Sequence, residues 1–312
     1  MADVVLPHQP VLLAEALAAL DIRAEGRYVD ATFGRGGHSA AILERLGPGG
    51  SLLALDRDPA AGDWARSHFR DPVRFQFVQT AFSRLADIIA ERGLCGQMHG
   101  VLLDLGVSSP QLDDPARGFG FSQNGALDMR MDPTSGSSAA DWVNRVSEGE
   151  LERVLMEFGE ERFHRRVARA IVAARQQAPI ATTARLADIV SSAIPTREPG
   201  KHPATRTFLA VRIAVNDELR ELRTVLPQAV RALAPGGRLV VISFHSLEDR
   251  MVKRFMREQA RGQEIPLDLP VKGMPEGMTL RLIGRVTRPT ATEVAINPRA
   301  RSALLRVAER LR

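Results

Sequence analysis

Residues 30–38 read Asp-Ala-Thr-Phe-Gly-Arg-Gly-Gly-His. They follow the short apolar run Tyr28–Val29 and precede a helical pattern of apolar residues that begins at Ala40. A glycine-rich turn between a strand and a helix brings the backbone close to a nucleotide-like ligand. The stretch therefore predicts the first strand–turn–helix unit of an open α/β sheet.

The charge of this turn indicates the kind of ligand. The carboxylate of Asp30 stands directly before the glycines, where it would repel a pyrophosphate and attract a cation. The dinucleotide spacing that starts with Gly34 and Gly36 would need a further glycine at position 39, where the chain has Ser39. Asp30, Gly34 and Gly36 together favour S-adenosylmethionine, which carries a sulfonium and an amino group and no phosphate.

The composition is that of an ordinary globular protein. The 312 residues are 44% hydrophobic and 25% charged, enough for one large domain or two modest ones. No apolar run approaches the roughly 20 residues of a membrane span, and the first residues lack the pattern of a secretory signal. The single cysteine, Cys95, excludes an internal disulfide and a cysteine-based metal cluster. We therefore expect a cytoplasmic protein with no membrane partner and no metal.

The net charge of +5 leaves the question of nucleic-acid binding open. Arginine greatly outnumbers lysine, and guanidinium groups suit contacts with phosphates and base edges. A genome rich in GC would also enrich arginine, and the abundant alanine agrees with that alternative.

Up to about residue 112 the pattern alternates between strand and helix. This alternation is typical of βαβ units around a parallel sheet. We expect strands at residues 28–31, 51–56, 73–78 and 100–105, and helices at 10–20, 37–46, 59–67 and 83–92.

The alternation then stops. Residues 113–136 are rich in Gly, Asp, Pro and Ser and predict a long loop. From Ala139 to Ala193 only helical periodicity remains. One apolar stripe there consists of Phe163, Val167, Ile171 and Ala174, while the arginines at 162, 165, 166 and 169 fall largely elsewhere. The sequence thus predicts an inserted helical segment.

The sheet resumes towards the C-terminus. A helix is expected from Ala204, broken near Pro227, and a strand at 238–244 after a Pro-Gly-Gly turn. A helix at 247–259, capped by Ser246, and two apolar segments at 279–283 and 302–308 complete the pattern. The fold class is therefore α/β with a mostly parallel seven-stranded sheet. Its discontinuous domain would comprise residues 1–112 and 216–312, and the insert residues 113–215.

Three further side chains are placed at strand ends, where open α/β sheets bind ligands. Asp56 lies about 20 positions beyond Gly34, which suits hydrogen bonds from ribose hydroxyls. It could instead cap the helix at 59–67, although Asp58 is better placed for that role, and it would also fit NAD. Asp104 could reach the adenine or the amino-acid end of the ligand, or cap a turn. Phe82 either lines an adenine pocket or belongs to the core.

The acceptor motif follows Asp104. Ser109-Pro110-Gln111-Leu112 is similar to the Ser-Pro-Pro-Tyr tetrapeptide of methyltransferases that act on exocyclic amines of cytosine or adenine, with the last two positions changed. An aryl amine is a poor nucleophile, so acceptors aimed at its N–H groups would assist the reaction. We expect Asp104, Ser109, the Pro110 carbonyl and Gln111 to position the amine; the alternative is a tight turn that binds nothing.

Two related questions concern the target base. Methylation at carbon 5 of cytosine needs a cysteine nucleophile, and Cys95 lies before the fourth strand, at the wrong end of the sheet. A flipped base would need a stacking partner. Phe119, Phe121 and Trp142 are candidates, each of which could equally be a core residue.

Seven sequence blocks, in order along nearly the whole chain, resemble one family. That family comprises the bacterial 16S ribosomal RNA methyltransferases that modify N4 of a decoding-site cytosine. The matching blocks are residues 8–12 (HQPVL), 32–38 (TFGRGGH), 104–113 (DLGVSSPQLD), 127–132 (LDMRMD), 202–208 (HPATRTF), 243–250 (SFHSLEDR) and 297–302 (NPRARS). The chain departs from the family pattern at Gly120, Asn124 and Ala126, in the loop after residue 113.

The resemblance implies a Rossmann-like methyltransferase domain interrupted by a small helical domain. It also implies methyl transfer from S-adenosylmethionine to the N4 amine, with 16S rRNA in the small ribosomal subunit as substrate. The cofactor contacts that it implies are Gly36, Gly37, His38, Asp56, Phe82, Asp104 and Gln111.

Basic residues of the insert and of the C-terminal segment are candidates for holding the RNA backbone, with solvated faces as the alternative. They are Arg162, Arg165, Arg166, Lys201, Arg206, Arg299 and Arg301. His245 either contacts the substrate or begins a helix. Two rival functions, an NAD-dependent dehydrogenase and a non-catalytic ribosome-assembly factor, are opposed by Asp30, Ser39 and the intact cofactor motif. The oligomeric state stays open.

Overall fold

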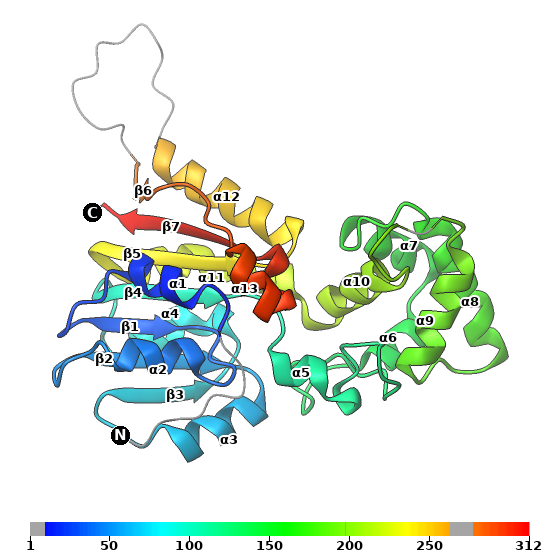
Figure 1. The fold of residues 1–312 in the computed structure, drawn as a ribbon, viewed down its shortest axis with the longest axis horizontal. Helices are drawn as coiled ribbons and strands as arrows, with labels where there is room; N and C mark the ends of the chain where they lie inside the picture. Colours follow the sequence, from blue (N-terminus) through cyan, green and yellow to red (C-terminus); the bar gives the residue numbers. More distant parts are fainter. Residues whose placement is uncertain (1–9, 197, 263–276, 312) are drawn as a thin grey trace, which may run out of the picture. The chain divides into compact units, whose positions relative to one another are not determined.

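The computed structural model describes residues 10–196, 198–262 and 277–311, so His8 and Gln9 of the first family block lie outside it. The chain forms two compact units (Figure 1). The first is the described part of Met1–Gly106 and Leu219–Arg312, and the second is Val107–Glu218. Among the described residues, no helix has both the length and the apolar character that crossing a membrane requires.

The first unit contains a seven-stranded sheet in the order β3-β2-β1-β4-β5-β7-β6. Neighbouring strands from β3 to β5 are parallel, and β7 is antiparallel to both β5 and β6. This confirms the predicted seven-stranded, mostly parallel sheet. The strands are β1 Arg27–Asp30, β2 Ser51–Asp56, β3 Phe75–Gln79, β4 Met98–Asp104, β5 Leu233–Ser243, β6 Leu280–Leu282 and β7 Leu304–Arg310.

Apolar side chains form two buried clusters with the sheet. One joins the sheet to α1 (Leu13–Leu20), α2 (Gly37–Leu43) and α3 (Pro59–His68). The other joins it to α4 (Leu85–Glu91), α11 (Glu218–Ala232) and α12 (Ser246–Arg261). The one-turn helix η1 (Phe82–Arg84) precedes α4, and α13 (Ala291–Ile296) and η3 (Pro298–Ser302) precede β7.

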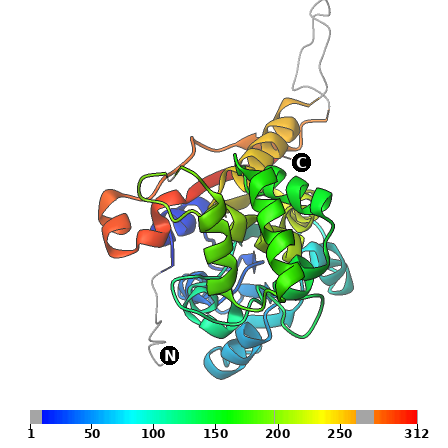
Figure 2. The same ribbon diagram turned by 90° about the vertical axis from the view of Figure 1, so that its right-hand side faces the viewer.

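The second unit is helical (green in Figures 1 and 2). Val167 and Ile171 of the predicted stripe are fully buried, and Phe163 and Ala174 pack against the same cluster, so that stripe is confirmed. The side chain of Asn216 holds part of the segment 113–136, which was predicted as a loop. It accepts a hydrogen bond from Met131 N (2.8 Å) and donates one to Met129 O (2.7 Å). The helices are α5 Ser109–Asp113, η2 Pro115–Arg117, α6 Ala139–Arg145, α7 Glu148–Glu157, α8 His164–Gln177, α9 Thr183–Ala193 and α10 Thr205–Asn216.

Three local predictions were wrong. The helical break falls at Asp217, which adopts a left-handed φ of 54°, while Pro227 lies inside α11. Buried residues on both sides of Pro227, such as Leu226 and Ala229, keep that segment helical despite the missing N–H. Strand β5 begins at Leu233, before the Pro-Gly-Gly turn, and His245 rather than Ser246 is the N-cap of α12.

Candidate active site

Asp30 is held in place by the turn that follows it. It is the last residue of β1 and only 1% exposed. Its carboxylate accepts hydrogen bonds from Ser39 Oγ (2.7 Å) and from Thr32 N (3.1 Å). Burial raises the pKa of Asp30 from 3.8 to about 6, and these two hydrogen bonds oppose that rise. The serine that breaks the dinucleotide pattern therefore supports the carboxylate.

The glycines of the turn are required by backbone geometry and by close packing. Gly34 and Gly36 have φ values of 56° and 74°, in the left-handed region. A Cβ at Gly36 would come within 2.5 Å of the Phe69 ring, and one at Gly37 within 2.3 Å of Pro10. The turn thus places the backbone at the N-terminus of α2 against its neighbours, leaving no space for side chains.

Asp56 ends β2 and faces the same turn. Its Oδ2 accepts from Gly34 N (2.7 Å) and its Oδ1 from Asp58 N (2.9 Å). The helix cap of α3 is supplied by Asp58, whose side chain accepts from Ala60 N (3.0 Å). Burial raises the pKa of Asp56. Each carboxylate oxygen has a second lone pair, so Asp56 retains the capacity to accept from hydroxyl groups.

Asp104 ends β4 and has an unsatisfied oxygen. Its backbone N–H donates to Thr32 Oγ1 (2.7 Å), which ties the ends of β1 and β4 together. The buried Oδ1 has no hydrogen-bond partner among the described residues, although the side chain as a whole is 25% exposed. The carboxylate is therefore approachable from one side. Burial, followed by the charges of Asp30 and Glu248, raises the pKa of Asp104 well above its usual range.

His38 faces Asp104 without forming an ion pair at neutral pH. Its Nδ1 lies 3.7 Å from Asp104 Oδ2, beyond hydrogen-bond distance. Its Nε2 lies 3.2 Å from the carbonyl oxygen of Val11, which can only accept, so the ring proton is on Nε2. Burial lowers the pKa of His38 to about 4. A neutral imidazole therefore turns its unprotonated Nδ1 towards the carboxyl group of Asp104.

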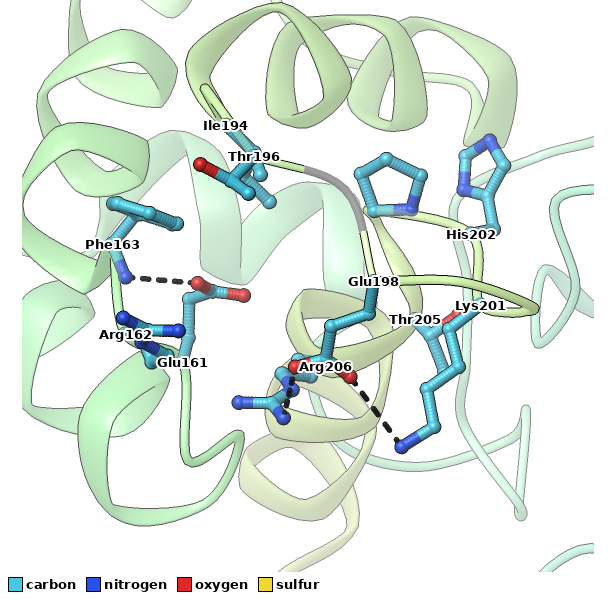
Figure 3. A pocket seen from close by; sticks show the side chains of 11 residues that line it. Glu161, Arg162, Phe163, Ile194, Thr196, Glu198, Lys201, His202, Thr205 and Arg206 are labelled. Carbon is cyan, nitrogen blue, oxygen red and sulfur yellow. Dashed lines mark hydrogen bonds and ion pairs between the residues drawn. The ribbon is translucent and has the colours of Figure 1, made fainter.

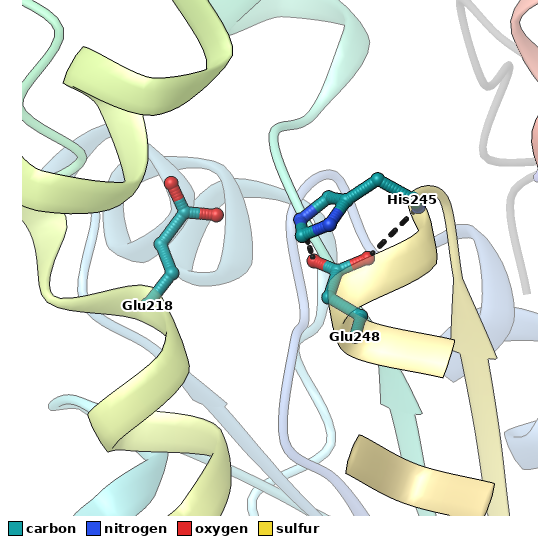
Figure 4. A group of neighbouring side chains, drawn as sticks. All are labelled: Glu218, His245 and Glu248. Atoms are coloured by element: carbon teal, nitrogen blue, oxygen red, sulfur yellow. Dashed lines mark hydrogen bonds and ion pairs between the residues drawn. The ribbon is translucent and has the colours of Figure 1, made fainter. Parts of the chain in front are cut away.

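Glu248 is a third carboxylate near this point. It is 3% exposed, and its Oε2 accepts from the backbone N–H of Phe244 (2.9 Å) and of His245 (3.3 Å) at the start of α12. Its Oε1 lies 3.1 Å from His245 Nε2 (Figure 4). His245 begins α12, as one of the two alternatives expected, and its contact with substrate stays a prediction. Asp30, Asp104 and Glu248 are called the acidic cluster below.

The acidic cluster has the charge and the acceptor groups that suit a bound cation. Each of its carboxylates would be more stable as an anion beside a positive charge, and Asp104 Oδ1 has no hydrogen-bond donor among the described residues. A primary ammonium group provides such donors together with the charge. These residues therefore fit the amino-acid end of S-adenosylmethionine, and they do not fit a phosphate.

Phe82 begins η1, directly after β3. Its ring is half-buried and packs against the apolar cluster beside α4 and α11. Its place at the carboxyl end of β3 agrees with both alternatives from the sequence, because the ring serves the core and remains partly exposed.

The acceptor motif is the start of a helix and not a rigid turn. Ser108 is the N-cap of α5, and Gln111 Oε1 accepts from Ser108 N (2.9 Å). The Pro110 carbonyl accepts from Asp114 N (3.1 Å). The alternative of a tight turn was therefore wrong in its local structure, because Ser108, Pro110 and Gln111 belong to the start of a five-residue helix. The expected part of these residues in positioning the amine stays a prediction. Gln111 lies in the second unit, and its predicted contact with the cofactor stays a prediction.

The candidate RNA-binding residues differ in their surroundings. Trp142 is half-buried against the core of the helical unit. Arg165 is 74% exposed and donates to Glu152 Oε1 (2.9 Å). The side chains of Arg166 on α8 and of Arg299 and Arg301 on η3 are exposed. Arg162, Lys201 and Arg206 are brought together, since all three line one pocket (Figure 3).

Sequence analysis missed two residues of the site. Ser39 was read only as a departure from a glycine pattern, and its hydrogen bond to Asp30 depends on the turn bringing α2 back over β1. Glu248 had a usable signal, since it follows His245 by three positions, the spacing of a capping box.

Comparison with known proteins places the chain in a family. Residues 5–311 match the model of the MraW methylase family. Three relatives are each named ribosomal RNA small subunit methyltransferase H. The protein of Thioalkalivibrio sulfidiphilus is 58% identical over 97% of both chains, and that of Thiobacillus denitrificans 56% over 97% of both. The protein of Chromohalobacter salexigens is 55% identical over 97% of this chain and 92% of its own. The chain described here therefore belongs to the MraW methylase family.

Proposed function

We propose that this protein transfers a methyl group from S-adenosylmethionine to the exocyclic N4 amine of a decoding-site cytosine in 16S ribosomal RNA. Membership of a methylase family and relatives named as ribosomal RNA small subunit methyltransferases confirm the coarser prediction, methyl transfer to RNA of the small ribosomal subunit. The choice of N4 as the acceptor atom and of a decoding-site cytosine as the target base belongs to the proposal. The cytoplasm, where bacterial ribosomes are made, is the corresponding location.

The observation that carries the choice of cofactor is the acidic cluster. S-adenosylmethionine, when bound, supplies an electrophilic methyl group on a sulfonium. Asp104 and His38 would hold the ammonium of its amino-acid end, through the unsatisfied oxygen and the Nδ1 lone pair. Asp56 would accept hydrogen bonds from the ribose hydroxyls, each charge-assisted bond contributing about 1.5–3 kcal/mol. Asp30 already accepts from Ser39 and Thr32 and is only 1% exposed, so it would act through its charge.

The sulfonium itself should have little direct contact with carboxylates. It loses its charge as the methyl group leaves, so a carboxylate against the sulfur would stabilise the reactants more than the transition state. Positioning of the two reacting atoms would then provide most of the acceleration.

Asp104 of the first unit would orient the acceptor amine. A part for Ser109, Pro110 and Gln111 of the second unit stays a prediction from the sequence. An acceptor aimed at an N–H of the amine takes up positive charge as it develops on nitrogen. The product ammonium is acidic enough to lose its proton to water, so no dedicated base is required.

The test is methyl transfer from labelled S-adenosylmethionine to small ribosomal subunits from cells that lack this protein, followed by nucleoside mass spectrometry. We expect a single new nucleoside, N4-methylcytidine. Label on another nucleoside would overturn the acceptor assignment. Tight subunit binding with no transfer would instead support the assembly-factor alternative.

A further inference from the structure

The pocket of the helical unit is lined by oppositely charged side chains (Figure 3). It lies among the start of α8, the segment that follows α9 and the start of α10. Its wall includes the cations Arg162, Lys201 and Arg206 and the acids Glu161 and Glu198. All these residues belong to one unit, so the pocket is complete within it.

One carboxylate bridges two of the cations. Glu198 Oε1 lies 2.7 Å from Arg206 Nη2, and Glu198 Oε2 lies 3.6 Å from Lys201 Nζ. Two oxygens of one anion thus face an arginine and a lysine. A phosphodiester has two non-bridging oxygens with the same capacity, and arginine and lysine are the usual partners of phosphate.

The bridging carboxylate is exposed, so an anion that enters from solvent can displace it. The side chains of Glu198 and Lys201 are 45% and 63% exposed. Exposed ion pairs contribute little to stability because water screens them and the long side chains lose entropy. By contrast, the other acid in the pocket, Glu161, is 5% exposed and accepts from Phe163 N (2.9 Å) at the start of α8. Glu198 alone is therefore exchangeable.

The partners of the bridging carboxylate are already positioned. Arg206 also donates through Nη1 to the carbonyl oxygen of Glu160 (2.5 Å), which fixes its guanidinium at the pocket wall. His202 also lines the pocket, and its Nδ1 accepts from Ala204 N (3.2 Å). The guanidinium of Arg206 would thus remain in place as a donor once Glu198 moves away.

We propose that this pocket binds a phosphodiester of the substrate RNA, and that Glu198 occupies the phosphate position in the free protein. The proposal rests on the proposed function, since it requires ribosomal RNA to be the substrate. Glu198 then weakens RNA binding by competition, while Arg206 and Lys201 strengthen it.

The test compares the binding of small ribosomal subunits, from cells lacking this protein, to the full-length wild type and to variants across a range of KCl concentrations. We expect Glu198→Gln to tighten binding about three- to tenfold, because the competing anion is gone. Lys201→Gln and Arg206→Gln should each weaken binding. Each should also reduce the slope of log affinity against log KCl concentration by about one, the change expected for one lost phosphate contact.

The matched controls are Glu150→Gln and Arg153→Gln. These two residues form an ion pair of 2.6 Å on α7 and do not line the pocket. Glu150→Gln changes the net charge by the same amount as Glu198→Gln, and Arg153→Gln by the same amount as Lys201→Gln or Arg206→Gln. We expect less than a twofold effect from each. Melting temperatures establish that all variants fold. Lys201→Gln is the substitution least expected to disturb the fold, because among the described residues the Lys201 side chain pairs only with Glu198.

Equal affinities for Glu198→Gln and Glu150→Gln would overturn the proposal, and so would weaker binding by Glu198→Gln. Methyl transfer by the wild type to the same subunits is measured in parallel. Loss of that transfer would count against the proposed function, whereas unchanged subunit binding across the pocket variants would count against the pocket alone.

Discussion

His38 Nδ1 and Asp104 Oδ2 lie 3.7 Å apart, so the unprotonated imidazole nitrogen faces a carboxyl group without a hydrogen bond between them. Burial holds the pKa of His38 near 4, so the pair is not an ion pair at neutral pH. An ammonium group between them would donate to both atoms and would favour the ionised form of Asp104. The geometry thus defines a place for a donor with a positive charge, at the carboxyl ends of β1 and β4.

The affinity for S-adenosylmethionine should depend on pH through the acidic cluster. Burial raises the pKa of Asp30 to about 6, and the pKa of Asp104 is also raised. Below pH 6 a proton on Asp30 competes with the bound cation, so we expect affinity to fall as pH falls from 7 to 5, by up to about tenfold per pH unit below 6 for this group. The raised pKa of Asp104 acts in the same direction. Calorimetric titration measures this, with neutral adenosine as the control ligand. An equally steep dependence for adenosine would contradict the account.

Ser39→Ala should destabilise the protein more at pH 8 than at pH 5. The folded pKa of Asp30, near 6, lies above its ordinary value of 3.8, so stability from this group falls as pH rises through 6. The hydroxyl of Ser39 offsets part of that loss, by about 1.5–3 kcal/mol when the carboxylate is ionised. Chemical denaturation at both pH values tests this. Ser67→Ala, which removes an exposed hydroxyl bonded to Asp63 O, is the control and should show no such difference.

Gly36→Ala should cost about 3 kcal/mol or more of stability, because a positive φ and a clash with the Phe69 ring act together. Gly93 has a similar φ of 64° with nothing within 4 Å of its Cβ position. Gly93→Ala should therefore cost only about 1 kcal/mol, the price of the backbone conformation alone. Denaturation curves of the two variants separate these effects, and equal losses would show that packing at Gly36 is unimportant.

The strand ends could be predicted from the sequence because apolar runs and polar residues alternate there in a simple way. Asp30, Asp56 and Asp104 each end a strand of the parallel sheet, and parallel strands bring their carboxyl ends to one edge. Their order along the chain was therefore enough to place them together.

Other features depend on tertiary contacts that no local pattern records. The helix does not break at Pro227, because buried residues on both sides of that proline maintain α11. The break falls instead at Asp217, the left-handed residue that ends α10. The pocket cations converge because separate helices of the insert pack together, which fixes Arg206 near Glu198. Charge alone did not distinguish these residues from Arg166, which stands exposed on α8.

The most direct test of the acidic cluster is the affinity of the Asp104→Asn variant for S-adenosylmethionine, measured by calorimetry at pH 7.5 beside wild type. The control is Asp63→Asn, which removes a carboxylate that is 75% exposed on α3. We predict a loss of about 10- to 100-fold for Asp104→Asn, as expected for one charge-assisted contact, with adenosine binding unchanged and the control within twofold of wild type. An unchanged affinity of the Asp104→Asn variant for S-adenosylmethionine would contradict the assignment of the acidic cluster to the cation of the methyl donor.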